Sequence, residues 1–428
     1  MNHRISNFWQ TRIRSGKNTR ILSNFLSLSV LQAANYVLPL LTLPYLIHVL
    51  GAEKFGLLAF ATAITAYFTT FTDYGFNLSA TREISIHRDD DEEISRIFSA
   101  VMILKMGLLI LGLLILIALV LISEKFSHNW AVFYLTFGAV IGQALFPVWF
   151  FQGMEQMKYV TYLNIGAKAA FTVLVFVFVH GDSDYLWVPG LTSAGGILAA
   201  VWSLYIVKKK FNVRFRLQPL WTLLAELKKG WHIFVATSFG SLYRESNTVI
   251  LGFLASPAAV GYYAIAEKIV KAIQSAQTPV GQALFPHLAR KEGGNVLTTF
   301  VLKYWKKVAA IYGLAWLSVL AASCPIIHLL AGGKDPRILT DFRVLATIVF
   351  VGGLNFYFGV LGLLSSGKSK AFSQAVGIAG TFNVVLCLSL SYFFADIGAT
   401  IAVTLSEMLL LAIIVRQVRH AIREEHEK

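Results

Sequence analysis

The chain is poor in charged residues. Only 14% of its 428 residues are Asp, Glu, Lys or Arg, against about 25% in an average soluble chain. Hydrophobic residues make up 56%, and a soluble globule of this length could not cover so much apolar surface with polar side chains. The shortage of charge therefore excludes a soluble protein and indicates an integral membrane protein.

Cysteine and the common catalytic motifs are also scarce. The two cysteines, Cys324 and Cys387, lie inside apolar runs, so we expect neither a disulfide framework nor a zinc site. His-Glu-x-x-His, a Gly-rich phosphate loop and a nucleophile elbow are all missing. The first apolar run is too long for a cleavable signal peptide and continues into Pro39 and Pro44. We expect no enzyme, no metal and no cofactor.

Long apolar runs dominate what is present. At roughly 20 residues per crossing, the hydrophobic content suffices for about twelve membrane crossings. A closed barrel would show short alternating strands instead, so the predicted class is an all-α polytopic membrane protein. The polar segment from Leu78 to Arg96 reads as a surface helix, with Asp89 to Glu93 on a solvated face. The predicted crossings are 22–50, 55–73, 98–122, 130–151, 159–180, 185–207, 231–254, 261–286, 306–331, 342–365, 371–394 and 396–415.

The formal net charge of +14 is concentrated on one side of the predicted membrane. Basic residues crowd the two tails and every second connection, and cytoplasmic loops carry such an excess. Both termini should therefore be cytoplasmic. Because short loops hold these residues, the charge does not indicate nucleic-acid binding. The cytoplasmic set is Arg4, Arg12, Arg14, Lys17, Arg20, Arg82, Arg88, Arg96, Lys158, Lys208, Lys209, Lys210, Arg214, Arg216, Lys228, Lys229, Arg290, Lys291, Lys303, Lys306, Lys307, Lys368, Lys370, Arg416, Arg419, Arg423 and Lys428; the opposite side holds Lys54, Lys125, Lys334, Arg337 and Arg343.

The two halves of the chain resemble each other. We predict an N-terminal six-helix bundle over 1–207, a basic cytoplasmic linker over 208–229 and a C-terminal six-helix bundle over 230–428. The segment Leu50 to Ala59 is echoed by Leu254 to Ala264. Such parallel repeats predict a transporter whose two pseudo-symmetric bundles move about a central cavity. Chance similarity of apolar helices is the alternative.

Several ionisable residues fall inside the predicted crossings, where each costs about 2.5–3.5 kcal/mol on insertion scales. The basic ones outnumber the acidic ones, so internal pairing leaves an excess of positive charge. A cationic cavity favours an anion, such as a phosphate or a carboxylate. The basic residues are Lys105, Lys168, Arg244, Lys268 and Lys271; the acidic ones are Glu245, Glu267 and Glu407, with Asp73 near a helix end.

Polar residues follow helical spacing in five crossings, which predicts polar faces on a water-filled cavity. The hydroxyl groups could instead pack against neighbouring helices. Glu267 could neutralise Lys271, Arg244 could pair with Glu407 or Asp73, and Lys105 could snorkel to the surface. The stripes are Thr62, Thr65, Thr69 and Thr72; Thr161, Asn164 and Lys168; Thr237, Ser241, Arg244 and Thr248; Lys268, Lys271, Ser275, Thr278 and Gln282; and Thr400, Thr404 and Glu407.

Three motifs carry a family resemblance. They are Tyr45 to Gly56 (YLIHVLGAEKFG), Thr72 to Glu83 (TDYGFNLSATRE) and Trp149 to Glu155 (WFFQGME). The chain thereby resembles the bacterial polysaccharide flippases, the O-antigen branch of the multidrug/oligosaccharidyl-lipid/polysaccharide transporter superfamily. The resemblance extends over the whole chain in length and crossing number and is sharpest in the first 160 residues. The C-terminal half departs, with Ala255 where the N-terminal repeat has Gly51.

The resemblance implies two six-helix bundles arranged as a V in the bacterial inner membrane. It implies transfer of an undecaprenyl-diphosphate-linked O-antigen or related repeat unit to the periplasmic leaflet by alternating access. The expected partners are this lipid-linked oligosaccharide, membrane lipids and other membrane proteins of polysaccharide assembly.

We join this resemblance to the polar stripes. Arg244, Lys268 and Lys271 would bind the diphosphate or acidic sugars, and hydroxyl groups would bind glycan. Pro39 and Pro44 would let the first crossing bend and gate the cavity. The candidate substrate-binding residues are Arg244, Lys268, Lys271, Lys168, Thr62, Thr65, Thr69, Ser275 and Thr278, and the candidate ion-coupling residues are Glu267, Glu407 and Asp73.

Two other functions remain open. A multidrug-type exporter of the same superfamily would share the fold, but it would need an acidic cavity for cationic drugs. A membrane-embedded glycan polymerase or ligase would need a substantial periplasmic loop, whereas the longest connection on that side runs only from Gly332 to Asp341.

Overall fold

The computed structural model describes residues 2–289, 297–332 and 335–426. Some residues of the basic pattern lie outside the residues whose side chains are described. They are Arg4, Arg12, Arg14, Lys17, Arg20, Arg290, Lys291, Lys334 and Lys428.

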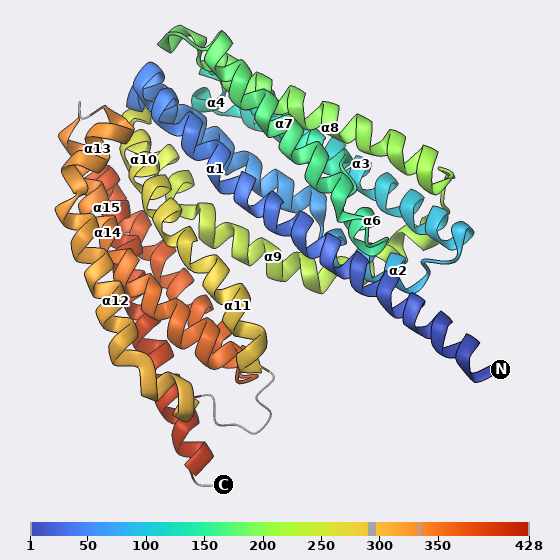
Figure 1. The fold of residues 1–428 in the computed structure, drawn as a ribbon. Helices are drawn as coiled ribbons and strands as arrows, with labels where there is room; N and C mark the ends of the chain where they lie inside the picture. Colours follow the sequence, from blue (N-terminus) through green and yellow to red (C-terminus); the bar gives the residue numbers. More distant parts are fainter. Residues whose placement is uncertain (1, 290–296, 333–334, 427–428) are drawn as a thin grey trace. The chain divides into compact units, whose positions relative to one another are not determined.

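Every regular element of the described residues is a helix (Figure 1). The predicted all-α class is therefore confirmed. The elements are α1 (Asn2–Asp73), α2 (Phe76–Ile86), α3 (Asp91–Ile122), α4 (Glu124–His128), α5 (Trp130–Leu145), α6 (Val148–Gly153), α7 (Met157–Phe178), η1 (Asp182–Leu186), α8 (Trp187–Phe211), α9 (Leu220–Leu254), α10 (Pro257–Gln274), η2 (Ser275–Gln277), α11 (Thr278–Ala289), η3 (Leu297–Val301), α12 (Leu302–Ala321), α13 (Ser323–Ala331), α14 (Pro336–Asn355), η4 (Phe356–Leu364) and α15 (Ser369–His426).

Each predicted crossing coincides with one to three of these elements. Among the described residues, seven helices are long and apolar enough to span a membrane, or eight if α12 and α13, which meet at a bend of 61°, form one span. The number is below twelve partly because α1 and α15 each contain two predicted crossings. Each of these helices is interrupted between its two crossings, by Gly51 (φ 68°) and by Ala395 (φ 50°). The breaks therefore lie where the sequence predicts the chain to leave the membrane.

One local expectation needs correction, and a second stays open. The predicted surface helix is shorter, because α2 ends at Ile86 and Asp90 begins a new helix by accepting hydrogen bonds from the backbone N–H groups of Glu92 and Glu93. Acidic residues in that first turn of α3 also interact favourably with the helix dipole. α1 keeps helical φ and ψ at Pro39 and Pro44 and loses them at Gly51. The bend and the gating role expected of these prolines stay predictions.

The chain forms two compact units. Unit 1 comprises 1–42 and 64–242, and unit 2 comprises 43–63 and 243–428. These bounds differ from the predicted division at 207 and 230, because α1 and α9 each contribute residues to both units. Within the predicted linker, only 212–219 lacks regular structure, and the rest continues α8 or begins α9.

Each unit has its own apolar core. In unit 1, the Trp149 to Glu155 motif supplies Trp149, Phe150 and Phe151, all fully buried. The ring of Phe98 lies 5.6 Å from that of Phe150 in an edge-to-face arrangement, which adds to the stability of such clusters. In unit 2, the core gathers residues of α11, η3, η4 and α15 around Tyr357. The aromatic motif is therefore part of the core that holds α3, α6 and α7 together.

Candidate functional site

Unit 1 contains a cavity of about 300 Å³ between α1, α5, α7 and α8. Close approach of α5 and α8 shapes one wall, because a Cβ on Gly142 would collide with the backbone of Gly196. This volume is at the lower end of the range for small-molecule sites. Lys168 of the predicted substrate-binding set lines the cavity. The polar residues of its wall are Thr42, Gln143, Asn164, Lys168, Thr172 and Thr192.

The basic residue Lys105 of α3 lies in unit 1 but does not line this cavity. The Lys105 side chain is 3% exposed, and its Nζ atom donates a hydrogen bond to Asp73 Oδ1 at 3.3 Å. The predicted snorkelling of Lys105 is therefore wrong, because an ion pair compensates its burial. Asp73, a predicted ion-coupling residue, already has a cation as its partner.

Three of the threonines predicted to line the cavity, Thr62, Thr69 and Thr72, donate hydrogen bonds to their own helix. Thr62 donates to the Leu58 carbonyl oxygen at 2.7 Å, and Thr69 donates to the Thr65 carbonyl oxygen at 3.0 Å. Thr65 and Thr72 are buried, Thr69 is half-buried and Thr62 is exposed. Burial of Thr65 and Thr72 thus agrees with the alternative that these hydroxyl groups pack against neighbouring helices. Thr62 and Thr69 keep surface that a ligand can reach.

The stripe from Lys268 to Gln282 is interrupted. It was expected on one helix face, but α10 ends at Gln274, the turn η2 covers Ser275, and α11 begins at Thr278. Ser275 donates to the Ala272 carbonyl oxygen at 2.6 Å, and both Ser275 and Thr278 are half-buried. Lys268 and Lys271 therefore share a helix with each other but not with Thr278.

The basic residues predicted to bind substrate do gather on the surface of unit 2. We name Arg244, Glu245, Glu267, Lys268 and Lys271 the cationic cluster, because it holds three bases and two acids. All three basic side chains are exposed. Glu245 lies within electrostatic range of each of them. The excess of positive charge is therefore present, although the acids reduce it.

Inside the cationic cluster, Glu267 pairs with Lys271, which is one of the alternatives to substrate binding considered from the sequence. Lys271 Nζ lies 3.0 Å from Glu267 Oε1, an ion pair between residues four apart on α10. Lys268 Nζ lies 4.7 Å from the centre of the Phe55 ring, a cation–π distance. The predicted tie from Arg244 to Glu407 is wrong, because Glu407 accepts hydrogen bonds from neutral groups instead.

The two remaining ion-coupling candidates belong to polar networks of unit 2. Glu407 accepts hydrogen bonds from Asn355 Nδ2 at 2.6 Å and from the Tyr243 hydroxyl at 3.4 Å. Glu267 accepts one from the Tyr263 hydroxyl at 3.0 Å, and Tyr263 accepts one from Asn247 Nδ2 at 3.1 Å. Their role in ion coupling stays a prediction.

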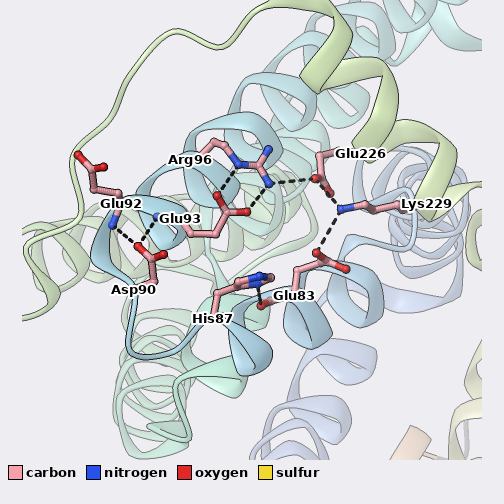
Figure 2. Close-up of polar contacts among 8 residues, drawn as sticks. All are labelled: Glu83, His87, Asp90, Glu92, Glu93, Arg96, Glu226 and Lys229. Atoms are coloured by element: carbon pink, nitrogen blue, oxygen red, sulfur yellow. Dashed lines mark hydrogen bonds and ion pairs between the residues drawn. The ribbon is translucent and has the colours of Figure 1, made fainter.

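A charged network at the polar ends of α2, α3 and α9 in unit 1 was not predicted (Figure 2). Glu226 has a side chain only 3% exposed and lies 3.1 Å from Lys229 Nζ and 3.9 Å from Arg96. Arg96 also pairs with Glu93 at 2.6 Å, and Lys229 with Glu83 at 3.1 Å. The acidic residue Glu93 is therefore paired, and does not lie on a purely solvated face.

Within this network the environment of Lys229 is strongly anionic. Burial alone would lower the pKa of Lys229, but hydrogen bonds and charges of Glu226 and Glu83 raise that pKa above its ordinary value. Lys229 therefore stays charged and connects α9 to α2. The helical spacings of Glu226 with Lys229 and of Glu93 with Arg96 are signals in the sequence that could have revealed part of this network.

A family model described as polysaccharide biosynthesis protein matches residues 21–292. The chain belongs to this family. A "Putative O-antigen transporter" of Escherichia coli (strain K12) is 31% identical over 417 residues, which cover 94% of this chain and 98% of that relative. A second protein of the same name, from Shigella dysenteriae, is 26% identical over 92% of this chain and 99% of its own length.

Two solved structures show the fold of this chain. An inward-facing multidrug resistance MATE family transporter of the MOP superfamily superposes with a TM-score of 0.70, at 14% identity, over 95% of this chain and 99% of its own. The lipid II flippase MurJ, in an inward closed conformation, superposes with a TM-score of 0.58, at 11% identity, over 93% of this chain and 87% of its own. The resemblance to the polysaccharide flippases is confirmed, and with the apolar helices it makes the chain a multi-pass protein of the bacterial inner membrane.

Proposed function

We propose that the protein is a flippase that carries an undecaprenyl-diphosphate-linked O-antigen or related repeat unit from the cytoplasmic to the periplasmic leaflet by alternating access. The observation that carries this proposal is the similarity, over nearly the full length of both chains, to an Escherichia coli protein named for O-antigen transport. The positive-inside pattern supports cytoplasmic termini. Lipid-linked oligosaccharide and membrane lipids are then its partners.

The cationic cluster supports this cargo. Arg244, Lys268 and Lys271 are exposed bases on one unit, and a diphosphate carries the negative charges that such a set attracts. The Phe55 ring beside Lys268 restricts that ammonium group without neutralising it. We assign diphosphate or acidic-sugar binding to these three residues.

The unit 1 cavity supports a second contact. Lys168, Asn164 and Gln143 supply polar groups to its wall, and such groups fix the orientation of a ligand in an otherwise apolar site. We assign a sugar or phosphate group of the cargo to this cavity. Outside this cavity, further hydroxyl side chains are accessible enough to contact the hydroxyl groups of a glycan. They are Thr62, Thr69, Ser275 and Thr278.

Deletion of the gene tests the proposal. The expected result is loss of the surface polysaccharide together with accumulation of a polyprenyl-diphosphate-linked repeat unit that stays accessible only from the cytoplasmic side. Lipid extraction followed by mass spectrometry would identify this intermediate. Normal surface polysaccharide after deletion, with no accumulated intermediate, would contradict the proposal.

A multidrug exporter is the second candidate, because the fold is shared with a MATE transporter at a TM-score of 0.70. An exporter would change the resistance of the deleted strain to cationic drugs while leaving its lipid-linked intermediates unchanged. The net positive cationic cluster disfavours this cargo. The same deletion strain therefore separates the two functions.

A further inference from the structure

Two carboxyl groups are buried side by side in unit 2. Asp341 on α14 is 0% exposed, and Asp396 on α15 is 3% exposed. The two carboxyl groups lie within electrostatic range of each other. Two ionised carboxylates so close in a buried site repel each other, which favours a proton on one of the two.

The surrounding donors do not satisfy both groups. Among the described residues, neither Asp341 Oδ2 nor Asp396 Oδ2 has a hydrogen-bond partner. The Thr400 hydroxyl lies 3.1 Å from Asp341 Oδ1 and 2.8 Å from the Asp396 carbonyl oxygen. A single hydroxyl proton serves one of these acceptors at a time. Buried oxygens left without a donor are costly, and a shared proton removes that cost.

The backbone explains how the second carboxyl group is positioned. Ala395 has φ 50° and ψ −123°, so it interrupts α15 and Asp396 starts the helical segment that follows. The first turn of a helix offers unsatisfied N–H groups and a positive dipole end, which favours the ionised form of Asp396. Asp341 lies beyond the first turn of α14 and lacks this advantage. The proton therefore belongs mainly to Asp341.

The charged neighbours of the pair have opposite signs. Arg337 on α14 acts on both carboxyl groups, and Asp335 acts on Asp396 with the opposite sign. The Arg337 guanidinium lies over the ring of Tyr262 of α10, 5.8 Å from ring centre to Cζ. Arg337 and Asp335 thus offset each other. Two buried ionised carboxylates would face each other without compensation.

We propose that Asp341 and Asp396 hold one proton between them and, with Thr400, form a proton-binding site of unit 2. Loss of that proton to solvent leaves two like charges in contact and pushes α14 away from the start of the second segment of α15. Proton binding thereby biases the packing of these two helices. Coupling of this step to transport rests on the proposed function, whereas proton binding itself does not.

Infrared difference spectroscopy tests the site on the full-length protein in nanodiscs, without any substrate. A shift from about pH 6 to about pH 9 spans the range in which an exposed Asp has long been ionised. The wild type should lose a protonated-carboxyl C=O band in this shift, and D341N and D396N should both lack the band. D89N is the control, because Asp89 is an exposed aspartate of unit 1, outside the unit that holds the pair; it should keep the band. An undiminished band in D341N would overturn the proposal.

Thermal unfolding gives a second readout. The folded site binds a proton that the unfolded chain releases at neutral pH, so the wild-type melting temperature should fall as pH rises. The amide of D341N can donate an N–H to Asp396, so this variant should fold. Its melting temperature should lack the decrease with rising pH that the site contributes. D89N should keep this slope. Equal slopes in D341N and the wild type would contradict proton binding.

A sodium ion is the competing occupant, and the same titration separates the two. In choline chloride and in sodium chloride the wild-type slope should be the same. Disappearance of the slope in sodium chloride, together with sodium-dependent stabilisation that D341N lacks, would show that sodium occupies the site and would overturn the proton assignment. These measurements do not depend on transport, so their failure is distinguishable from failure of the proposed function.

Discussion

Gly56 and Gly261 make reciprocal contacts in unit 2. A Cβ on Gly56 would collide with the carbonyl oxygen of Pro257, and a Cβ on Gly261 would collide with the carbonyl oxygen of Ala52. Ala52 and Pro257 are 205 residues apart, as are Gly56 and Gly261. The two repeat segments therefore cross with an approximate local twofold relation, as in an isologous interface. Small residues four apart permit such close helix crossings in membranes.

Replacement of Gly261 by alanine should destabilise unit 2. The added methyl group has no room against the Ala52 carbonyl oxygen, and overpacking of this kind costs about 1–3 kcal/mol. We expect a lower melting temperature for the purified protein, measured by fluorescence-detected thermal unfolding. G377A is the control, because a Cβ at Gly377 meets no atom within 4 Å. If both variants melt like the wild type, the helices do not cross at these glycines.

Replacement of Lys105 by methionine should destabilise unit 1. Asp73 would lose its partner at 3.3 Å, and breaking a buried ion pair costs about 3–5 kcal/mol, less where one group is partly exposed as Asp73 is. The neutral double variant D73N/K105M should recover most of the loss in melting temperature. A double variant no more stable than K105M would show that the ion pair is not the reason for the destabilisation.

The network around Glu226 should show measurable coupling. In a double-mutant cycle, E226A and K229A should couple by about 0.5–1 kcal/mol, because Glu226 is buried although Lys229 is partly exposed. The comparison pair is Arg216 and Glu92, 3.7 Å apart with both side chains exposed. Its coupling should be close to zero. Equal coupling in the two pairs would contradict a special role for the buried carboxylate.

Charge reversal at Lys271 should abolish surface polysaccharide at normal protein levels. The swap E267K/K271E separates two explanations, since it keeps the ion pair and the net charge but moves the cation by one turn of α10. If Lys271 binds an anionic cargo, the swap should not restore the polysaccharide, which is measured by gel electrophoresis of cell extracts. Full restoration of the polysaccharide by the swap would show that Lys271 acts only through its ion pair with Glu267 and does not bind the cargo.

The long helices and the positions of the breaks at Gly51 and Ala395 could be predicted because they depend on neighbours in the sequence. Long apolar runs predict the helices, and Gly51 breaks α1 between two predicted crossings. The pairing of Lys271 with Glu267 could also be weighed, because residues four apart on a helix face each other. Local spacing thus predicts local structure in this chain.

Contacts between distant segments could not be predicted. Asp73 and Lys105 were both recognised as intramembrane charges, but nothing in their spacing indicates that α1 and α3 bring them together. Asp341 and Asp396 fall at the ends of predicted crossings, where a carboxylate usually meets water. Only packing of α14 against α15 buries both groups. The missing information is the register between helices.

Flipping by the purified protein tests the central claim most directly. The protein would be reconstituted in liposomes that contain a polyprenyl-diphosphate-linked oligosaccharide, with a lectin or glycosidase added outside to report the fraction of cargo in the outer leaflet. The account predicts that wild-type protein makes nearly all the cargo accessible and that K271E leaves about half protected, as in protein-free liposomes with two equal leaflets. Half of the cargo protected with the wild-type protein as well would contradict the account.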